Sequence, residues 1–412
     1  MNHEVDIVII GAGAAGIAAA RRLADAPLRV LAVEAAPRVG GRAWTATVNG
    51  MSLDFGAEWL HSGARNPWAA LGSDLGFAID RRRANWWMQY NDLGFSPEEQ
   101  EAASAAYAAW SEGLAAAPDD CAAKALPADG AWNGYIRAIA SYVSGAELEH
   151  LSGRDYAAYD EAADAENFRS PEGFGALIAA AWPENVALRL ATPVQEVALT
   201  PDGIALSTRA GSIRAGAAIV TVSTAVLAGD SIRWPNEIGD WREAARRLPL
   251  GRNEKIFLEI VAPGFFEDDT HLIGNPRDPA AAAYDIRPFG RPVIECFLGG
   301  ASAAALEHEG PAASSARAID ELAGLFGADV RPALRPLAAT HWGRDDRIGG
   351  AYSYALPGAA EARADLARPF DDRLFFAGEA TDPRDFTAAH GAYASGRRAA
   401  EEALAALARQ RK

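Results

Sequence analysis

The apolar and polar positions near the start of the chain alternate in the order strand, helix, strand. An apolar run of strand type covers residues 5–10 and leads into the segment Gly11-Ala-Gly13-Ala-Ala-Gly16, after which an alanine-rich stretch has helical character. A second apolar run ends at Glu34. The pattern predicts a βαβ unit with a glycine-rich turn between its first strand and its helix.

This turn has the chemistry of a dinucleotide site. Gly11 permits the tight turn, Gly13 lets the backbone approach a pyrophosphate, and Gly16 lets the helix pack closely on the sheet. The N-terminus of the helix offers unpaired N–H groups and a partial positive charge to phosphates. Glu34 is placed to accept hydrogen bonds from an adenosine ribose. A glycine-rich turn in some other α/β protein is the alternative, and the register of strand, helix and acid favours dinucleotide binding.

The pattern further along the chain changes in character twice. Residues 69–151 are mostly helical in character, and residues 187–222 have the short alternating strands of a β-meander that returns to an apolar strand. Further strands are predicted near residues 253–261, 293–298, 335–342 and 373–378, and helices over residues 173–182, 314–326 and 389–409. Because the strands at the two ends of the chain share one character, the pattern predicts two interleaved domains.

Composition narrows the functional classes. The 412 residues, half of them hydrophobic, suit a globular protein with a sizeable core. A formal charge of −16 argues against nucleic acid and anionic membranes as partners. Cys121 and Cys296 form no CxxC pattern, so neither a metal site nor a disulfide framework is expected. The N-terminus lacks the positive region of a signal peptide and no apolar run could span a membrane, so we expect a cytoplasmic location. No oligomeric state is predicted.

Several blocks occur in the order found in the flavin-containing amine oxidase family, which includes monoamine oxidases, polyamine oxidases and flavin histone demethylases, and the chain resembles that family. The blocks are the glycine-rich turn with Glu34 and Gly40-Gly41-Arg42, GAEWLHSGARNP (56–67), TPVQEV (192–197), IVTVSTAVL (219–227), NEKIFLEI (253–260), THWGRDDRIGGAYSYALPG (340–358) and LFFAGEATDPRDFTAAHGAYASGRRAA (374–400). They span nearly the whole chain except the helical segment, and their form is most similar to that of polyamine oxidases.

The resemblance implies an α/β fold of two interleaved domains. A Rossmann-like FAD-binding domain would comprise residues 1–80, 185–235 and 365–412. A substrate domain of mixed β-sheet and flanking helices would comprise residues 81–184 and 236–364, with the helical segment as a lobe. The length gives no sign of an added chromatin-binding insertion.

The resemblance also assigns positions that contact FAD. Gly378 and Glu379 would lie near the ribityl-pyrophosphate part of the cofactor. Monoamine oxidases attach FAD through a cysteine in the loop that matches 349–352, and because Ala351 stands there, noncovalent FAD is implied. The full set of FAD-binding positions is Gly11, Gly13, Ala14, Ala15, Gly16, Glu34, Ala35, Gly40, Gly41, Arg42, Gly56, Ala57, Glu58, Trp59, Val194, Trp342, Gly378, Glu379, Ala388 and Ala389.

Four residues are implied in catalysis. Lys255 would hold a water against flavin N5, where a cation supports the reaction of reduced flavin with O₂. Trp342 and Tyr352 would form part of an aromatic wall that excludes water and attracts positive charge. His61 would lie near the substrate nitrogen. The alternatives are a surface lysine and a hydrogen-bonded structural histidine.

Besides Ala351, a second position differs from many family members. These members have a tyrosine shortly before the glycine-alanine pair of the last block, which is Gly391-Ala392 here. Thr387 or Ala388 occupies that place, so a two-tyrosine sandwich is expected to be absent or rebuilt, for example by Phe386. This resembles the polyamine oxidase and demethylase branch.

The implied reaction transfers hydride from the α-carbon of a neutral amine to flavin N5. The imine is hydrolysed to a carbonyl compound and an amine, and O₂ as acceptor gives H₂O₂. A polyamine is the favoured small-molecule substrate because of the block around His61 and the acidic run from Asp160 to Glu166, which would attract distal ammonium groups. Three alternatives remain open: a secondary or cyclic amine, an L-amino acid bound through residues 81–83 or Arg169, and an FAD-containing binding or scaffold protein without turnover.

Overall fold

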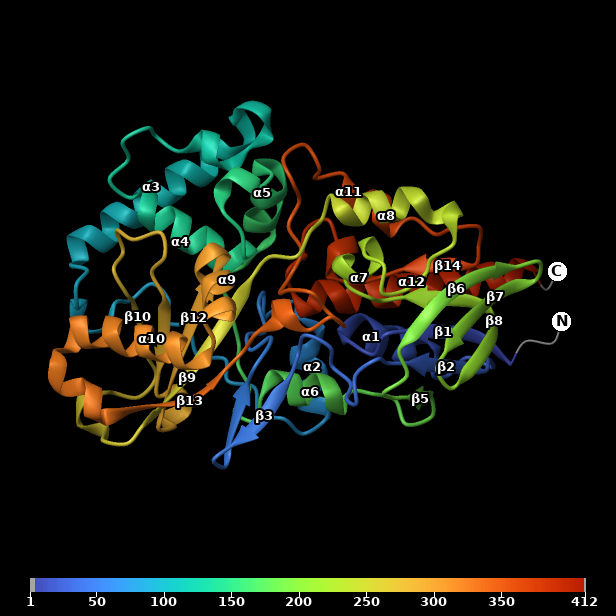
Figure 1. The fold of residues 1–412 in the computed structure, drawn as a ribbon, viewed down its shortest axis with the longest axis horizontal. Coiled ribbons are helices and arrows are strands. Elements are labelled where there is room, and N and C mark those ends of the chain that lie inside the picture. Colours follow the sequence, from blue (N-terminus) through green and yellow to red (C-terminus); the bar gives the residue numbers. More distant parts are fainter. Residues whose placement is uncertain (1–3, 411–412) are drawn as a thin grey trace.

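Two large β-sheets lie at opposite ends of the molecule, and helices cover both of them (Figure 1). This computed structural model describes residues 4–410. One sheet combines parallel and antiparallel pairs and the other is antiparallel, so the predicted α/β class is confirmed. The mixed sheet contains the N-terminal strand, whereas the sheet that contains Lys255, which was expected to be mixed, has antiparallel pairs. The domain boundaries given above stay a prediction.

The first sheet draws its strands from three distant parts of the chain. Its order is β5-β2-β1-β8-β7-β6, with β14 also paired to β8. The long strand β8 pairs with β1, and it also pairs with β7 through its first half and with β14 through its second half. Strands from the two ends of the chain, β1 and β14, therefore meet in one sheet. The strands are β1 (Val5–Ile10), β2 (Val30–Val33), β5 (Ala187–Arg189), β6 (Val194–Thr200), β7 (Gly203–Thr208), β8 (Gly211–Val220) and β14 (Leu374–Phe376).

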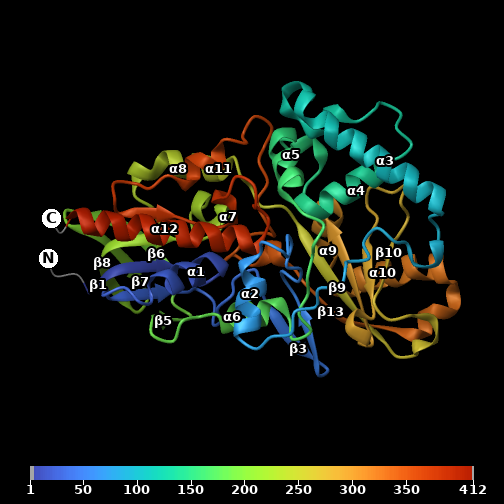
Figure 2. The same ribbon diagram turned by 180° about the vertical axis from the view of Figure 1, so that it is seen from behind.

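Two alanine-rich helices cover one face of this sheet. They are α1 (Ala14–Leu23) and α12 (Ala389–Gln410), which run together along the sheet (Figure 2). A Cβ atom added at Gly396 of α12 would lie 2.1 Å from the carbonyl oxygen of Ala15, so only glycine allows this approach. Small residues along both helices therefore set their packing distance.

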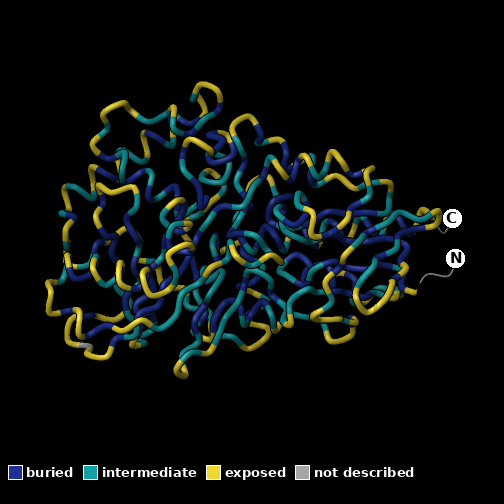
Figure 3. Tube along the Cα trace, in the orientation of Figure 1, coloured by how far each residue is buried: buried dark blue, intermediate teal, exposed yellow. Residues whose placement is uncertain are grey.

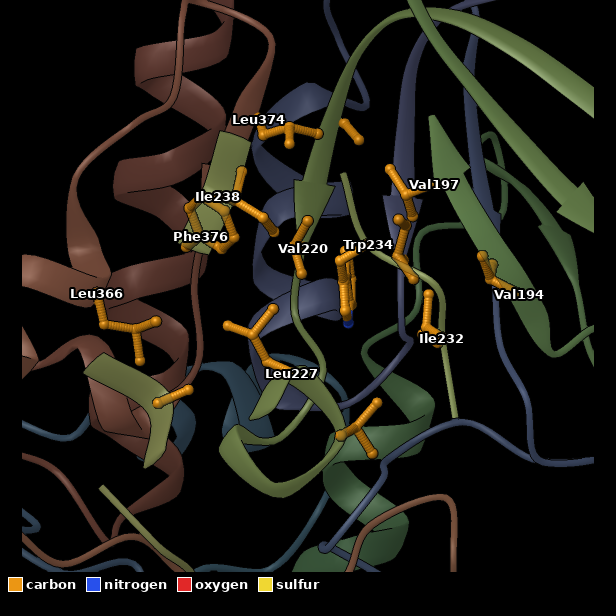
Figure 4. Packing of buried hydrophobic residues seen from close by; sticks show 14 of the residues in the cluster. Val194, Val197, Val220, Leu227, Ile232, Trp234, Ile238, Leu366, Leu374 and Phe376 are labelled. Atoms are coloured by element: carbon orange, nitrogen blue, oxygen red, sulfur yellow. The ribbon is translucent and has the colours of Figure 1, made fainter. Parts of the chain in front are cut away.

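The other face of the first sheet packs against short helices. Val220, Leu227, Trp234 and Phe376 belong to one buried cluster there, and Figure 4 shows their side chains converging between the strands and the covering segments. The helices are α7 (Thr224–Ala228), α8 (Gly239–Arg246) and α11 (Ala362–Ala367). The first sheet is thus buried on both faces, as expected of a largely parallel sheet.

The second sheet has the order β10-β11-β12-β9-β13. Its strands are β9 (Asn253–Ile260), β10 (Thr270–Ile273), β11 (Ala283–Ile286), β12 (Val293–Gly299) and β13 (Leu334–Ala339), and α9 (Gly300–Glu309) and α10 (Pro311–Phe326) pack on it. Side chains of the sheet and both helices form one apolar cluster. The hairpin of β3 (Thr45–Val48) and β4 (Met51–Asp54), with α2 (Pro67–Asp74) and α6 (Phe174–Ala180), lies between the two ends (Figures 1 and 2).

The helical lobe contains α3 (Pro97–Gly113), α4 (Asn133–Ser144) and α5 (Gly153–Ala162). The prediction of helical character from residue 69 was wrong for residues 75–96, which form loops with one short 3₁₀ turn. Gly76 and Gly94 have positive φ angles there, which interrupt a helix. The next helix begins with a capping box, in which Ser96 and Glu99 each bond the other's backbone N–H.

Buried backbone is concentrated in the interior of both halves, and exposed positions follow the loops at the rim (Figure 3). Within residues 4–410, no helix combines the length and the apolar composition that a membrane crossing requires.

Candidate active site

The glycine-rich turn after β1 is built by close backbone contacts. A Cβ atom at Gly16 would lie 2.1 Å from the carbonyl oxygen of Gly11, and Gly11 itself has a φ of +106°. Gly13 bridges to Gly40 in parallel fashion, so the turn lies against the Gly40-Gly41 segment. The two glycine-rich blocks of the sequence therefore lie side by side in the fold.

Glu34 lies beneath this turn at the end of β2. Its Oε2 accepts a hydrogen bond from the N–H of Ala12 and its Oε1 from the N–H of Ala36, both at 2.7 Å. A carboxylate has about four acceptor positions, so two bonds to the backbone leave room for ribose hydroxyls. Glu34 thus orders the turn, a role that the sequence analysis did not foresee.

The residues here fit a bound FAD. Among the described residues, no side chain caps the N-terminus of α1, which leaves its first N–H groups free for phosphate oxygens. A nearby hollow is lined by Arg42, Thr224, Gly378 and other residues, and a Cβ added at Gly378 would meet open space. The hydroxyl oxygen of Thr224 is buried and has no partner within residues 4–410, as expected of a group that can bond a cofactor.

Glu379 joins the N-terminal and C-terminal blocks at this hollow. It is 5% exposed and forms an ion pair with Arg42 at 2.9 Å. It also accepts hydrogen bonds from the N–H and hydroxyl of Ser353 and from the N–H of Thr387. Burial alone raises the pKa of Glu379, but Arg42 and Arg363 more than offset this, and the net pKa is lowered. The carboxylate is therefore charged at neutral pH.

Arg42 also donates to the carbonyl oxygen of Ala351 at 2.5 Å. This contact brings the loop at 349–352 against the glycine-rich blocks. This loop has Ala351 at the position where monoamine oxidases have the cysteine that binds FAD.

Lys255 lies at the centre of a second buried cluster. It is 8% exposed, which excludes the surface-lysine alternative. Its Nζ lies 2.5 Å from Oε2 of Glu58 and 3.5 Å from Oε2 of Glu295, and it donates to the carbonyl oxygen of Asp54 at 2.9 Å. Glu58, expected only as a cofactor contact, is thus an ion-pair partner of the lysine.

Burial and neighbouring charges shift the pKa values of the groups in this cluster. Burial by itself lowers the pKa of Lys255, but the nearby Glu58, Glu295 and Asp54 raise it by more than burial lowers it. The net pKa of Lys255 is therefore raised, and its ammonium stays charged. Burial raises the pKa of Asp54 to about 6. Burial, followed by repulsion from Glu58, raises the pKa of Glu295 well above its ordinary value. The cluster therefore places three carboxyl groups around one ammonium.

Aromatic side chains lie beside the cluster. The indole Nε1 of Trp342 donates to the carbonyl oxygen of Phe55 at 2.9 Å, and the Trp342 ring meets Trp44 edge-on with centroids 6.4 Å apart. The hydroxyl of Tyr352 donates to the carbonyl oxygen of Tyr142. Trp342 is therefore fixed to the segment that also carries Asp54 and Glu58.

His61 is held in a defined tautomer. Its Nδ1 lies 2.8 Å from Oδ1 of Asn167, a carbonyl-type oxygen that can only accept, so Nδ1 carries the hydrogen and Nε2 is left as an acceptor. Burial lowers the pKa of His61 to about 4. The ring lies 5.7 Å from that of Trp86, which in turn meets Trp59 at 4.5 Å.

Other expected positions lie at the ends of elements. Val194 begins β6 opposite Thr208, and Ala388 and Ala389 lie at the start of α12. Phe386 is 3% exposed; the guanidinium of Arg363 lies 3.5 Å from the centre of its ring, and the Tyr159 ring is tilted against it at 5.5 Å.

Glu295, Asn167 and Asp54 were missed as partners of the site. Glu295 had a usable signal, since it is a single charge inside the apolar strand VIECFLG.

Comparison with known proteins agrees with this geometry. The family model "Flavin containing amine oxidoreductase" matches residues 159–404, and "NAD(P)-binding Rossmann-like domain" matches residues 9–73. Polyamine oxidase 2 of Arabidopsis thaliana is 26% identical over 450 residues, covering 97% of this chain and 88% of the relative. Polyamine oxidase 3 of Oryza sativa subsp. japonica is 27% identical, covering 97% and 89%. Lysine-specific histone demethylase 1 homolog 1 of the same rice is 26% identical, but only 53% of its length is covered.

The fold is also similar to solved structures. Wild-type putrescine oxidase bound to putrescine matches with a TM-score of 0.73 at 19% identity, covering 97% of this chain and 99% of the other. The predicted architecture, the cradle of glycines around Glu34 and the family match over more than half of the sequence lead to one conclusion. The chain belongs to the flavin-containing amine oxidoreductase family and is an FAD-dependent amine oxidase with a Rossmann-like domain.

Proposed function

We propose that this enzyme oxidises a polyamine-type substrate with O₂ as acceptor, giving an imine and H₂O₂, and that it holds FAD without a covalent bond. FAD, when bound, supplies the acceptor for the hydride from the α-carbon of the amine. The glycine-rich turn, Glu34, Arg42 and Glu379 would hold it. Ala351 supports noncovalent attachment because its side chain offers no nucleophile.

The observation that carries the proposal is the charge of the cluster around Lys255. Glu58, Asp54 and Glu295 place three carboxyl groups around the single ammonium of Lys255. Acidic groups therefore outnumber the ammonium in a buried site lined by Trp342 and Phe55. Such a site attracts a cation and excludes water.

A second set of acids lies beside the His61 loop. The N–H of Gly63 donates to the carbonyl oxygen of Glu166 at 2.6 Å, and Asn167 bonds His61. The end of the acidic run at Glu166 therefore lies beside the loop that carries His61. Two acidic regions suit a substrate with two or more amino groups better than a monoamine.

His61 and the aromatic rings would orient the amine. The free Nε2 of His61 accepts a hydrogen bond from a substrate N–H, and because His61 is neutral it does not repel an ammonium group. The rings of Trp59, Trp86 and Trp342 limit water around the C–H bond that breaks. The proposed role of these residues is binding, orientation and exclusion of water.

The L-amino acid alternative has weaker support. Arg169, a candidate for the carboxylate, is 3.1 Å from Asp269 and lies between the rings of Trp59 and Phe289. An arginine already paired and stacked is poorly placed to bind a second carboxylate.

The test is anaerobic mixing of the flavin-loaded enzyme with a panel of amines while flavin absorbance is followed. The panel contains spermidine, spermine, N-acetylated polyamines, monoamines, cyclic amines and L-amino acids. Rapid bleaching by the polyamines, followed by H₂O₂ on adding air, is expected. Bleaching by cyclic amines or amino acids alone would overturn the polyamine assignment. No bleaching by any amine, with normal reduction by dithionite, would support a binding role without turnover.

A further inference from the structure

Glu254 and Glu307 form a buried pair of acids behind Trp342. Glu254, on β9, is 2% exposed, and Glu307, on α9, is 9% exposed. Oε1 of Glu254 accepts the N–H of Trp342 at 2.7 Å, and Oε1 of Glu307 accepts the N–H of Gly343 at 2.6 Å. Oε2 of Glu307 accepts from Nη1 of Arg252 at 3.0 Å. The two acids therefore hold successive amides of one turn.

One oxygen of the pair lacks a donor. Oε2 of Glu254 is buried and receives no hydrogen bond from an N–H or O–H group of residues 4–410, although the two side chains are within hydrogen-bonding reach of each other. Two ionised carboxylates in contact would repel, and a buried acceptor without a partner is costly. A single proton between the carboxyl groups removes both problems.

The surroundings keep that proton on Glu254. Burial, followed by the contact with Glu307, raises the pKa of Glu254 to about 9. The charged groups that face it are Glu307 from α9 and Arg252, which reaches Glu307 from the residue before β9; the nearby hydroxyl of Thr340 opposes the rise in the pKa of Glu254 only in part. Since Arg252 favours negative charge on Glu307, Glu254 is the member that stays neutral.

We propose that Glu254 donates a shared proton to Glu307 and that the resulting acid pair positions Trp342 at the substrate site. The proposal rests on the proposed function, in which the Trp342 indole lines that site. Two hydrogen bonds hold Trp342: its backbone N–H donates to the Glu254 carboxyl group, and its indole Nε1 donates to the carbonyl oxygen of Phe55 at 2.9 Å. Loss of the proton places two charges beneath the turn and loosens the indole.

Unfolding measurements test the shared proton without any need for activity. Glu254→Gln keeps an acceptor for Trp342 and an N–H donor for Glu307 but cannot ionise. Because the folded wild type would bind one proton more than the unfolded chain between about pH 4.5 and 9, its unfolding constant should rise by up to about tenfold per pH unit relative to that of the variant. Urea unfolding of both flavin-loaded proteins across pH 5–9 measures this, and parallel pH curves would overturn the shared proton.

Glu259→Gln is the matched control, since Glu259 lies on the same strand and accepts from exposed Asn49 at 3.3 Å. It should reproduce the pH dependence of the wild type. If it flattens the curve as Glu254→Gln does, the effect does not belong to the acid pair.

Flavin reduction by an active amine tests the positioning role. We expect the wild-type rate to fall near pH 9, and Glu254→Gln should lose this fall while staying within about twofold of the wild-type rate at neutral pH. Glu254→Ala, without donor or acceptor, should be slower at every pH. An alkaline fall unchanged in Glu254→Gln would overturn the role. If no amine reduces any of the proteins, the proposed function fails, while the unfolding comparison still decides the shared proton.

Discussion

Oε2 of Glu58 lies 2.5 Å from the ammonium nitrogen of Lys255, although the two residues are 197 positions apart in the chain. The side chains are 12% and 10% exposed. This buried ion pair joins the loop after β4 to the first residues of β9 and fixes the lysine near Trp342. The position of Lys255 therefore depends on a residue that the sequence analysis had treated as a cofactor contact.

We predict that Glu58→Gln destabilises the protein by about 2–3 kcal/mol. The loss is below the upper range for a broken buried pair because Glu295 and the carbonyl of Asp54 still bond Lys255. Denaturant unfolding measures it. The double variant with Lys255→Met should recover most of the loss, since it removes both charges, and equal losses in the single and double variants would contradict the pairing.

Lys255→Met should slow the reaction of reduced flavin with O₂ by about a hundredfold, because a fixed positive charge near the site of developing negative charge is lost. Flavin binding should persist, since the glycine-rich turn and Glu379 are unchanged. Stopped-flow mixing of reduced enzyme with O₂ measures the rate. Reoxidation at the wild-type rate would remove the lysine from this step.

His61 should make stability fall in mild acid. Its pKa is about 4 in the folded protein and about 6.5 in an unfolded chain, so the unfolded state binds the proton first as pH falls. Between about pH 6.5 and 4 this contributes a loss of up to about 3 kcal/mol, which is absent above pH 6.5. His61→Gln should flatten the curve over that window, as followed by urea unfolding. A curve as steep as that of the wild type would show that His61 is charged in the folded protein.

Glu379→Gln should weaken flavin retention and cost about 2–3 kcal/mol, since it leaves Arg42 without its carboxylate and removes the buried negative charge that Arg363 also stabilises. Dialysis followed by flavin absorbance measures retention. The same substitution at Glu402, which pairs with Arg398 along the outer part of α12, should cost only about 0.3–0.5 kcal/mol. Similar losses at both positions would argue against a special role for Glu379.

Precipitating the wild type with acid should release the yellow flavin into the supernatant. The reason is that Ala351 offers no sulfur for a covalent bond, and Cys121 and Cys296 lie elsewhere in the fold. Flavin that stays with the pellet would contradict noncovalent attachment.

Short-range sequence patterns were sufficient to predict several helices and strands that surround the glycine-rich turn. The strand at 5–10, the glycine-rich turn and the helix that follows were predicted because spacing and small residues leave few other conformations. The C-terminal helix was predicted over 389–409 and spans Ala389–Gln410. In contrast, residues 75–96 are rich in residues that tolerate helix, and their loop conformation depends on packing and on Gly76 and Gly94.

By itself, the sequence determined the α/β class, the βαβ cradle and the family, because these rest on short-range patterns and on motifs in fixed order. Only the tertiary structure decided what surrounds Lys255, which nitrogen of His61 is free, and that Glu254 faces Glu307. Each of these depends on side chains from strands and helices far apart in the chain. A charge buried by folding takes its partner from whatever the packing brings within a few ångströms, and no local pattern records that choice.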